Sequence, residues 1–314
     1  MTFTATFGPT YGDDSAAVVP GSEATVGYVI EVARQHLYGS HRAEWNRVAT
    51  TMTATQGTVD VDFELRGIAR GTYIAIDDEV MYVWEVESGI GRASLQRGML
   101  GSTAATHTAG AMVEVNPRFP KFLIRRALKD EVRSWGRKLY ATQSATLTPT
   151  SRAVNLNGVD EFFHVLAVEA SPRSGSDMWY PVKFRTVSQM DTVDFASGRA
   201  ILLEHELDTG QRLRVTIARP FELDAFADST DLQVNVGLAA SMLDIPPLGA
   251  AWRLMAGREV MRTAVEGQGQ PRNAAEVPPG HNIQTAQALK ELRDARLNEE
   301  AMRLALQYNW KQQT

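Results

Sequence analysis

The residue types that carry most enzyme chemistry are sparse here, and their spacing fits none of the common catalytic or metal-binding motifs. There is no cysteine, which excludes disulfides, thiolate nucleophiles and cysteine metal ligands. The sequence has no P-loop, no G-x-G-x-x-G after a strand, no H-E-x-x-H and no G-x-S-x-G. It therefore predicts a protein without enzymatic activity, cofactor or metal. The six histidines are scattered: His36, His41, His107, His164, His205 and His281.

Three groups of titratable residues come nearest to a reactive site. The stretch Glu204-His205-Glu206 has acid–base residue types, but in a strand the middle side chain points away from its neighbours. His36 and His41 are five residues apart, so they do not share a helix face as a metal pair would. The run 59–65 alternates apolar residues with three carboxylates. Calcium sites usually take their ligands from a bent turn, so this alternation indicates a solvated strand face.

Length and composition place the chain among ordinary globular proteins. It has 314 residues, enough for two domains, with 44% hydrophobic and 22% charged residues. A net charge of −5 does not favour a nucleic-acid binder. The first residues are polar and lack a signal-peptide pattern, and no apolar run approaches the roughly 20 residues of a membrane span. We expect a cytoplasmic location, or a particle assembled there, without membrane contact.

Hydrophobic periodicity predicts an α+β fold. It comprises a helical core, two antiparallel β modules (a β-hairpin module and a small β-sandwich or barrel) and a long C-terminal helix. The expected segments are an extended arm at 1–21, a helix at 22–48, a β module at 49–116, a basic amphipathic helix at 117–143, a β-sandwich or barrel-like domain at 144–236, and a helical region at 237–314 with a loop at 266–282.

The stretch 73–115 organises the first β module. Apolar runs flank a turn at Asp77 and Asp78, and a third run ends at Arg97-Gly98 before a loop rich in glycine and threonine. His107 lies in that loop, where a hydrogen bond that fixes the loop backbone is its simplest role. We interpret the polar residues of this stretch as turn and loop architecture.

The strongest charge asymmetry lies on the predicted helix after this module. Between Arg118 and Lys138 there are eight basic and two acidic residues. Two interpretations of this basic helix are possible: a solvated helix face, or a contact with an acidic protein surface or with DNA phosphate. The basic stripe, taken as a candidate interface, consists of Lys121, Arg125, Lys129, Arg133 and Arg137.

The C-terminal region reads as helices interrupted by proline. Pro246 and Pro247 are expected to break or kink a helix between Leu238 and Val265. The last helix, from Ile283 to about Trp310, is either docked on the body or offered to a neighbouring subunit. Its apolar candidates for an interface are Leu289, Leu292, Leu297, Leu304, Tyr308 and Trp310.

Several degenerate strand-and-turn patterns together resemble structural proteins of tailed bacteriophages. The first, "I-x-I-D-x-E-x-M-x-V", falls on Ile74, Ile76, Asp77, Glu79, Met81 and Val83. The second, "R-G-x-x-G-(S/T)-x-A-x-x-H-x-x-G", falls on Arg97, Gly98, Gly101, Ser102, Ala104, His107 and Gly110. The second β region is similar to a unit in phage neck and tail proteins, through Trp179, through Phe195, Gly198, Arg199, Ile201 and Leu203, and through the run from Gly210 to Phe221.

This resemblance implies a head-to-tail connector, or adaptor, of the phage neck with an adaptor-like helical core. Such a subunit forms a homo-oligomeric ring, twelve-fold in the family, between the portal protein and the stopper, tail-terminator or tail proteins. Viral DNA would pass through the lumen without sequence-specific binding. The protein would then belong to the virion, after assembly in the host cytoplasm.

Three alternatives stay open at this point. The β regions are larger than a minimal adaptor needs, which leaves room for a tail-tip, baseplate or other minor tail protein. A carbohydrate-binding or hydrolytic tail module could use Trp179 and Tyr180 as a sugar platform, although core aromatics are the simpler reading. A DNA-binding regulator conflicts with the net charge.

Overall fold

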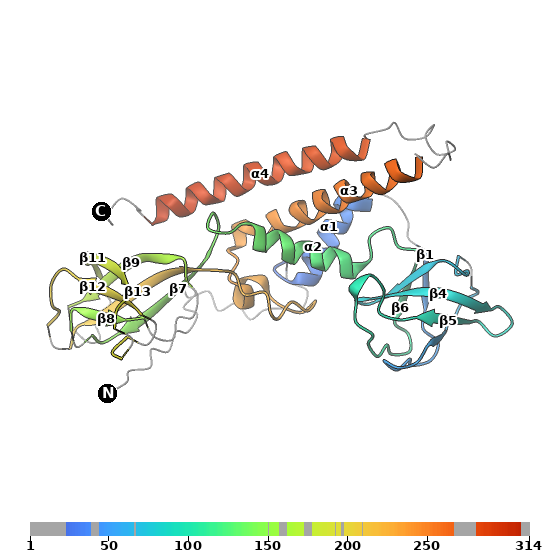
Figure 1. The fold of residues 1–314 in the computed structure, drawn as a ribbon, viewed down its shortest axis with the longest axis horizontal. Coiled ribbons are helices and arrows are strands. Elements are labelled where there is room, and N and C mark those ends of the chain that lie inside the picture. The colour runs from blue at the N-terminus through green and yellow to red at the C-terminus, as the bar shows by residue number, and fades with distance from the viewer. Residues whose placement is uncertain are drawn as a thin grey trace. The chain divides into compact units, whose positions relative to one another are not determined.

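The computed structural model describes residues 23–38, 44–65, 67–149, 151–156, 162–172, 178–191, 193–195, 198–208, 210–266 and 281–308. The chain forms two compact units. One, here called the barrel unit, comprises Tyr28–Glu131 and Pro246–Arg293. The other, the two-sheet unit, comprises Val132–Ile245 with the flanking segments up to Gly27 and from Asp294. Figure 1 shows the helices and strands of both units.

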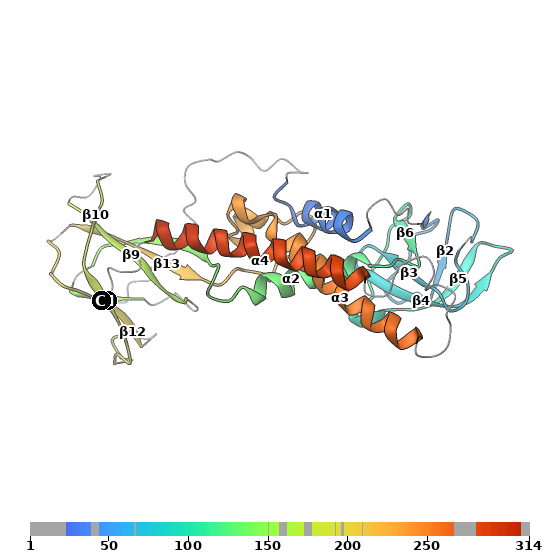
Figure 2. The same ribbon diagram turned by 90° about the horizontal axis from the view of Figure 1, so that it is seen from above.

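The barrel unit is built on one antiparallel sheet of six strands in the order β1-β6-β3-β4-β5-β2. Figure 2 shows this sheet from a second direction. The strands are β1 (Glu44–Arg47), β2 (Thr58–Asp60), β3 (Tyr73–Ile76), β4 (Glu79–Glu87), β5 (Arg92–Gln96) and β6 (Met112–Val115). A short 3₁₀ turn, η1 (Met99–Gly101), lies between β5 and β6.

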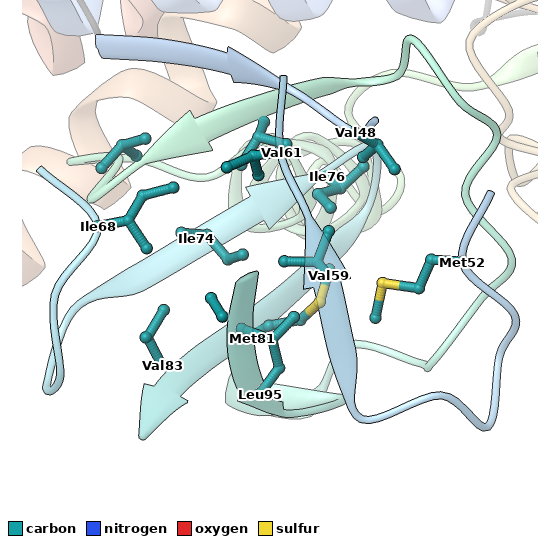
Figure 3. Close-up of a cluster of buried hydrophobic side chains, with 13 residues drawn as sticks. Val48, Met52, Val59, Val61, Ile68, Ile74, Ile76, Met81, Val83 and Leu95 are labelled. Atoms are coloured by element: carbon teal, nitrogen blue, oxygen red, sulfur yellow. The ribbon is translucent and has the colours of Figure 1, made fainter. Parts of the chain in front are cut away.

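The two outer strands of this sheet curl toward each other. Val48 just after β1 forms an antiparallel bridge with Val61 just after β2. The Asn46 side chain then acts in place of a backbone rung, because its Oδ1 accepts from the Phe63 N–H at 3.1 Å and its Nδ2 donates to the Phe63 carbonyl at 3.3 Å. The curled sheet encloses the apolar core drawn in Figure 3, which includes Met52, Ile74 and Met81.

Two helices contact the curled sheet and its connections within the same unit. Helix α1 (Val26–Tyr38) places Arg34 in an ion pair with Glu114 of β6. Tyr38 at its end packs edge-to-face on Phe119, with ring centroids 5.6 Å apart. Helix α2 (Lys121–Ser134) joins Arg125 to Asp78 at 2.9 Å.

The two-sheet unit contains a four-stranded sheet in the order β10-β9-β13-β7 and a three-stranded sheet in the order β11-β12-β8. Both contribute to one apolar core, which includes Val154, Ile201 and Val215. The strands are β7 (Ala141–Leu147), β8 (Ala153–Asn155), β9 (His164–Ser171), β10 (Tyr180–Pro181), β11 (Phe184–Ser188), β12 (Arg199–Leu203) and β13 (Arg212–Arg219). Two short turns follow: the π turn η2 (Leu232–Val236) and the 3₁₀ turn η3 (Ala240–Met242).

The expected fold class, a helical adaptor-like core with smaller β modules, is wrong. The chain is mostly antiparallel β, with a curled half-barrel sheet and about 32% helix. One reason is that residues expected to extend the first helix form a strand instead. Glu44–Arg47 pairs with β6 along its whole length, so tertiary pairing overrides the helical pattern there.

The proline pair also acts differently from the expectation. Helix α3 (Ile245–Glu266) begins at Ile245, so Pro246 and Pro247 lie in its first turn. The first N–H groups of a helix have no acceptor within it, and therefore proline is tolerated there. The last helix, α4 (His281–Gln307), has 27 residues. The expected arm at 1–21 and nearly all of the loop at 266–282 lie outside the described residues.

Candidate functional site

The most connected polar group in the barrel unit is Glu79, the first residue of β4. The turn at Asp77 and Asp78, with Asp77 at φ 52°, reverses the chain from β3 into β4. The Glu79 carboxylate is fully buried and faces the segment between β5 and β6. It accepts hydrogen bonds from the backbone N–H groups of Gly98 at 3.1 Å and Ala105 at 2.9 Å.

Arg97 is the main partner of Glu79, and all five of its N–H donors are used. Nε and Nη2 donate to the two Glu79 carboxylate oxygens, each at 2.6 Å. Nη1 donates to the carbonyls of Thr53 and Gln56 at 2.9 and 2.8 Å, and Nη2 also donates to the Ala105 carbonyl at 2.6 Å. This bidentate pairing, extended to three backbone carbonyls, ties two loops, the one before β2 and the one after β5, to the start of β4.

His107 completes the arrangement between two carboxylates. Its Nδ1 lies 3.0 Å from Asp77 Oδ2, and its Nε2 lies 3.0 Å from Glu79 Oε2. Burial alone lowers the pKa of His107, but hydrogen bonds to Asp77 and Glu79 raise it above its ordinary value. For Glu79 the directions are opposite: burial alone raises its pKa. Hydrogen bonds from Arg97, from the two backbone N–H groups and from His107 outweigh burial and lower the pKa to about 2. We call Asp77, Glu79, Arg97 and His107 the Glu79 network.

The loop that this network holds has a backbone that suits glycine. Gly98 has φ 63°, and a Cβ there would lie 3.2 Å from the Ser102 carbonyl. Leu100 also has a positive φ of 57° and is exposed. The Ser102 hydroxyl accepts from the Val80 N–H at 3.0 Å and donates to the Met99 carbonyl at 2.8 Å. The residues that carry the second phage-like pattern are therefore those that shape and fasten this loop.

The Glu79 network has the chemistry of a structural contact that holds the loop in place. Glu79 is ionised, and both of its oxygens already accept hydrogen bonds, so it is a poor base and a poor metal ligand. Across the described ranges, no group of three or more histidine, aspartate or glutamate side chains could hold a metal ion. None of the described helices is long and apolar enough to cross a membrane.

The structure divides the predicted basic stripe. Arg125 is occupied by its ion pair with Asp78, and its side chain is only 11% exposed. Lys121 and Lys129 are half-buried, and Arg133 is exposed near the end of α2. Arg137 lies beyond the helix, with its guanidinium 6.0 Å from the centre of the Phe163 ring. Whether any of these residues forms an interface stays a prediction.

The predicted apolar side of the last helix is divided as well. Leu297 and Leu304 are buried, whereas Leu289 and Tyr308 are half-buried. Leu292 is exposed. Trp310 lies outside the described residues. Two further apolar residues of this helix, Met302 and Leu306, are exposed at 69% and 85%.

The remaining candidates do not gather into a site. Glu204, His205 and Glu206 are all exposed just after β12. In the carboxylate run, only Asp60 belongs to a strand, and it forms an ion pair with Arg92 at 2.6 Å. The Trp179 ring lies against two guanidinium groups, at 5.4 Å from Arg212 and 4.6 Å from Arg214.

A further buried carboxylate of the barrel unit was not predicted from the sequence. Glu131 of α2 has a fully buried side chain that accepts from Arg253 Nε at 2.9 Å and from Arg293 Nε at 2.6 Å. Gly249 makes room for it, because a Cβ there would lie 2.1 Å from the Glu131 carboxyl carbon. The signal in the sequence is Gly249 itself, a glycine inside the predicted helical region, which often marks a close packing contact.

Comparisons with models of known protein families and with curated proteins find no match for this chain.

Proposed function

We propose that this chain is a structural subunit of a tailed-bacteriophage virion, and specifically a connector subunit at the head-to-tail junction. The observation that carries the proposal is the Glu79 network. The polar residues of the phage-like patterns in the barrel unit bond to one another and to the backbone, as expected of a scaffold module.

The proposed role does not depend on a helical core. A ring forms when one surface of a subunit meets a different surface of the next and the rotation closes. In this chain, exposed apolar side chains on α4, including Leu292, Met302 and Leu306, are candidates for such contacts. The exposed Arg133 adds positive charge at the end of α2. The proposed partners are further copies of the chain, the portal protein, and the stopper or tail proteins.

Two alternative functions differ in how well the structure supports them. A tail-tip or baseplate subunit would use the same kinds of surface, so its position and copy number must be measured. A sugar-binding tail module is less well supported, because Trp179 already stacks with Arg212 and Arg214. An aromatic ring that binds a sugar face needs that face open.

The proposal is tested by imaging the purified full-length chain and the particles that contain it. We expect rings of the purified protein by negative-stain electron microscopy, and labelling of the chain at the neck of intact particles. The copy number, measured by quantitative mass spectrometry against the portal protein, should be near twelve. Label at the distal tail end, with three or six copies per particle, would favour the tail-tip role. Absence of the chain from purified particles would overturn both.

A further inference from the structure

The four-stranded sheet of the two-sheet unit has two unlike edges. One edge is β10, which has only two residues, and one of them is Pro181. Proline has no N–H to donate, and a short edge strand offers few groups to a newcomer. The other edge is β7, which pairs with β13 through seven consecutive residues, Ala141–Leu147. In the part of the chain that the structure describes, no strand pairs with the other side of β7.

The sequence of β7 lacks the devices that usually protect an edge. ATQSATL contains no charged residue, no proline and no glycine. Thr142 and Thr146 are exposed, and they share one face of the strand with Ser144. Ala145 and Leu147 lie on the opposite face, toward the core. A long, neutral edge with unpaired backbone groups is a template for another strand.

We propose that β7 joins two copies of this chain by pairing antiparallel with β7 of the second copy, across a twofold axis at Ser144. In this register, Thr142 of one copy faces Thr146 of the other, and Ser144 faces Ser144. Ala141 faces Leu147, and Gln143 faces Ala145, so each core-side residue stays on the core side in both copies.

The residues of β7 suit pairing with β7 of a second copy. No like charges meet in the proposed register, because the strand has none. Threonine pairs that face each other across strands are favourable, and Ser144, whose hydroxyl bonds to Thr216 of β13 at 2.8 Å, is small and neutral at the twofold axis. A twofold contact is isologous and closes on itself, which leaves other surfaces available for a ring. The proposal therefore goes beyond the connector role and does not rest on it.

Two matched double variants test the register. Thr142→Lys with Thr146→Lys places lysine opposite lysine in the pair, whereas Thr142→Lys with Thr146→Glu places lysine opposite glutamate. Both positions are exposed, but residue 146 faces Arg214 of β13 within the same copy, so the melting temperature of each variant is measured first, and the variants are compared in sedimentation only well below both melting temperatures. We expect wild type and the Lys/Glu variant to sediment as dimers, or as larger assemblies built from paired copies. The Lys/Lys variant should show a dissociation constant at least about tenfold higher.

A cysteine variant adds a covalent readout, because the natural chain has no cysteine. Residues that face each other in an antiparallel pair have Cβ atoms about 4.5–5.5 Å apart, close to the separation in a disulfide. Ser144→Cys should therefore cross-link two copies under mild oxidation, and Ser188→Cys on the edge strand β11 should not.

Three outcomes would overturn the proposal: a monomeric wild type, equal sedimentation of the two double variants, or equal cross-linking at 144 and 188. Rings seen by microscopy without cross-linking at 144 would contradict the β7 pairing and leave the connector proposal intact. If the chain cross-links at 144 but is absent from particles, the β7 pairing stands and the connector proposal is contradicted.

Discussion

A buried charge is tolerated when its partners surround it, and Glu79 shows this at the scale of one residue. Its carboxylate is fully buried and contacts one guanidinium, one imidazole and two backbone N–H groups. If the Glu79 carboxylate is removed, the donors around it lose a buried, charged acceptor. The cost of such a loss is larger than the value of the bond itself.

Glu79→Gln should destabilise the barrel unit by about 3–5 kcal/mol, because Arg97 would then be left with a neutral partner. The measurement is urea unfolding, followed by hydrogen exchange of the 97–107 segment to locate the effect. Glu85→Gln on the same strand is the matched control, since Glu85 is exposed, and it should change stability by less than about 0.5 kcal/mol. Equal effects of the two substitutions would show that the network contributes nothing.

His107 gives the barrel unit a pH dependence whose sign follows from its raised pKa. A group with a folded pKa above the unfolded value of 6.5 stabilises fully below that value. The stabilisation is lost as the pH rises through the folded pKa. The stability difference between wild type and His107→Gln should therefore shrink as the pH is raised from about 6.5. A difference that stays constant over this pH range would contradict the role of His107 in the network.

Glu79 produces the opposite trend at low pH. Its pKa is lowered to about 2, so its contribution is present above the ordinary value of 4.5 and is lost as the pH falls toward 2. Wild type should therefore approach the stability of Glu79→Gln in strong acid. A constant difference between the two proteins across that range would contradict an ionised, hydrogen-bonded Glu79.

The sequence predicted part of this network. The reading of Asp77, Arg97, Gly98 and His107 as turn and loop architecture is confirmed by their hydrogen bonds. The central place of Glu79 was not predicted. A carboxylate that alternates with apolar residues looks like a solvated side chain. Only the contact with residues 18 to 28 positions away shows that it is buried.

At the scale of elements, packing decides where helices can approach each other. Gly249 of α3 lies where the Glu131 side chain of α2 must pass, and that side chain is held from both sides by Arg253 and Arg293. The side chain cannot move aside without breaking two ion pairs. The glycine is therefore a packing requirement of the barrel unit, although it lowers the helix propensity of α3.

Gly249→Ala should destabilise the protein by about 1–3 kcal/mol, because the added methyl group overlaps the Glu131 carboxyl group. Gly257→Ala in the same helix is the control, since nothing lies within 4 Å of a Cβ at that position. That substitution should be neutral or stabilising by up to about 1 kcal/mol, the difference in helix propensity. Thermal unfolding of both variants checks the prediction, and equal melting temperatures would contradict it.

Among the elements, some strands were predicted from the local sequence pattern and others were not. The strands between 73 and 115 are where alternation and turn residues placed them. The strand Glu44–Arg47 was assigned to the helix at 22–48, because its extended conformation is determined by pairing with β6, which is distant in the sequence. The balance of the fold class was wrong for the same reason, since partners distant in the sequence determine how a sheet curls.

At the scale of the whole molecule, the helix α4 both stabilises the chain and presents a surface. Leu297 and Leu304 are buried, so removal of the helix would confound folding with assembly. Met302 and Leu306 in the same helix are exposed at 69% and 85%. Substitutions at these exposed residues therefore separate the two roles more cleanly than a truncation does.

Met302→Glu combined with Leu306→Glu should leave the melting temperature nearly unchanged, because both side chains are already in solvent. If α4 contacts a neighbour in the neck, two buried glutamates at that contact would prevent assembly. Particles made with this variant should accumulate filled heads without tails, counted by electron microscopy. Leu304→Ala is the contrasting variant, which should lower stability by about 2–5 kcal/mol through a cavity. Normal joining of heads to tails by a folded Met302→Glu, Leu306→Glu protein would exclude this surface of α4 from the connector contact.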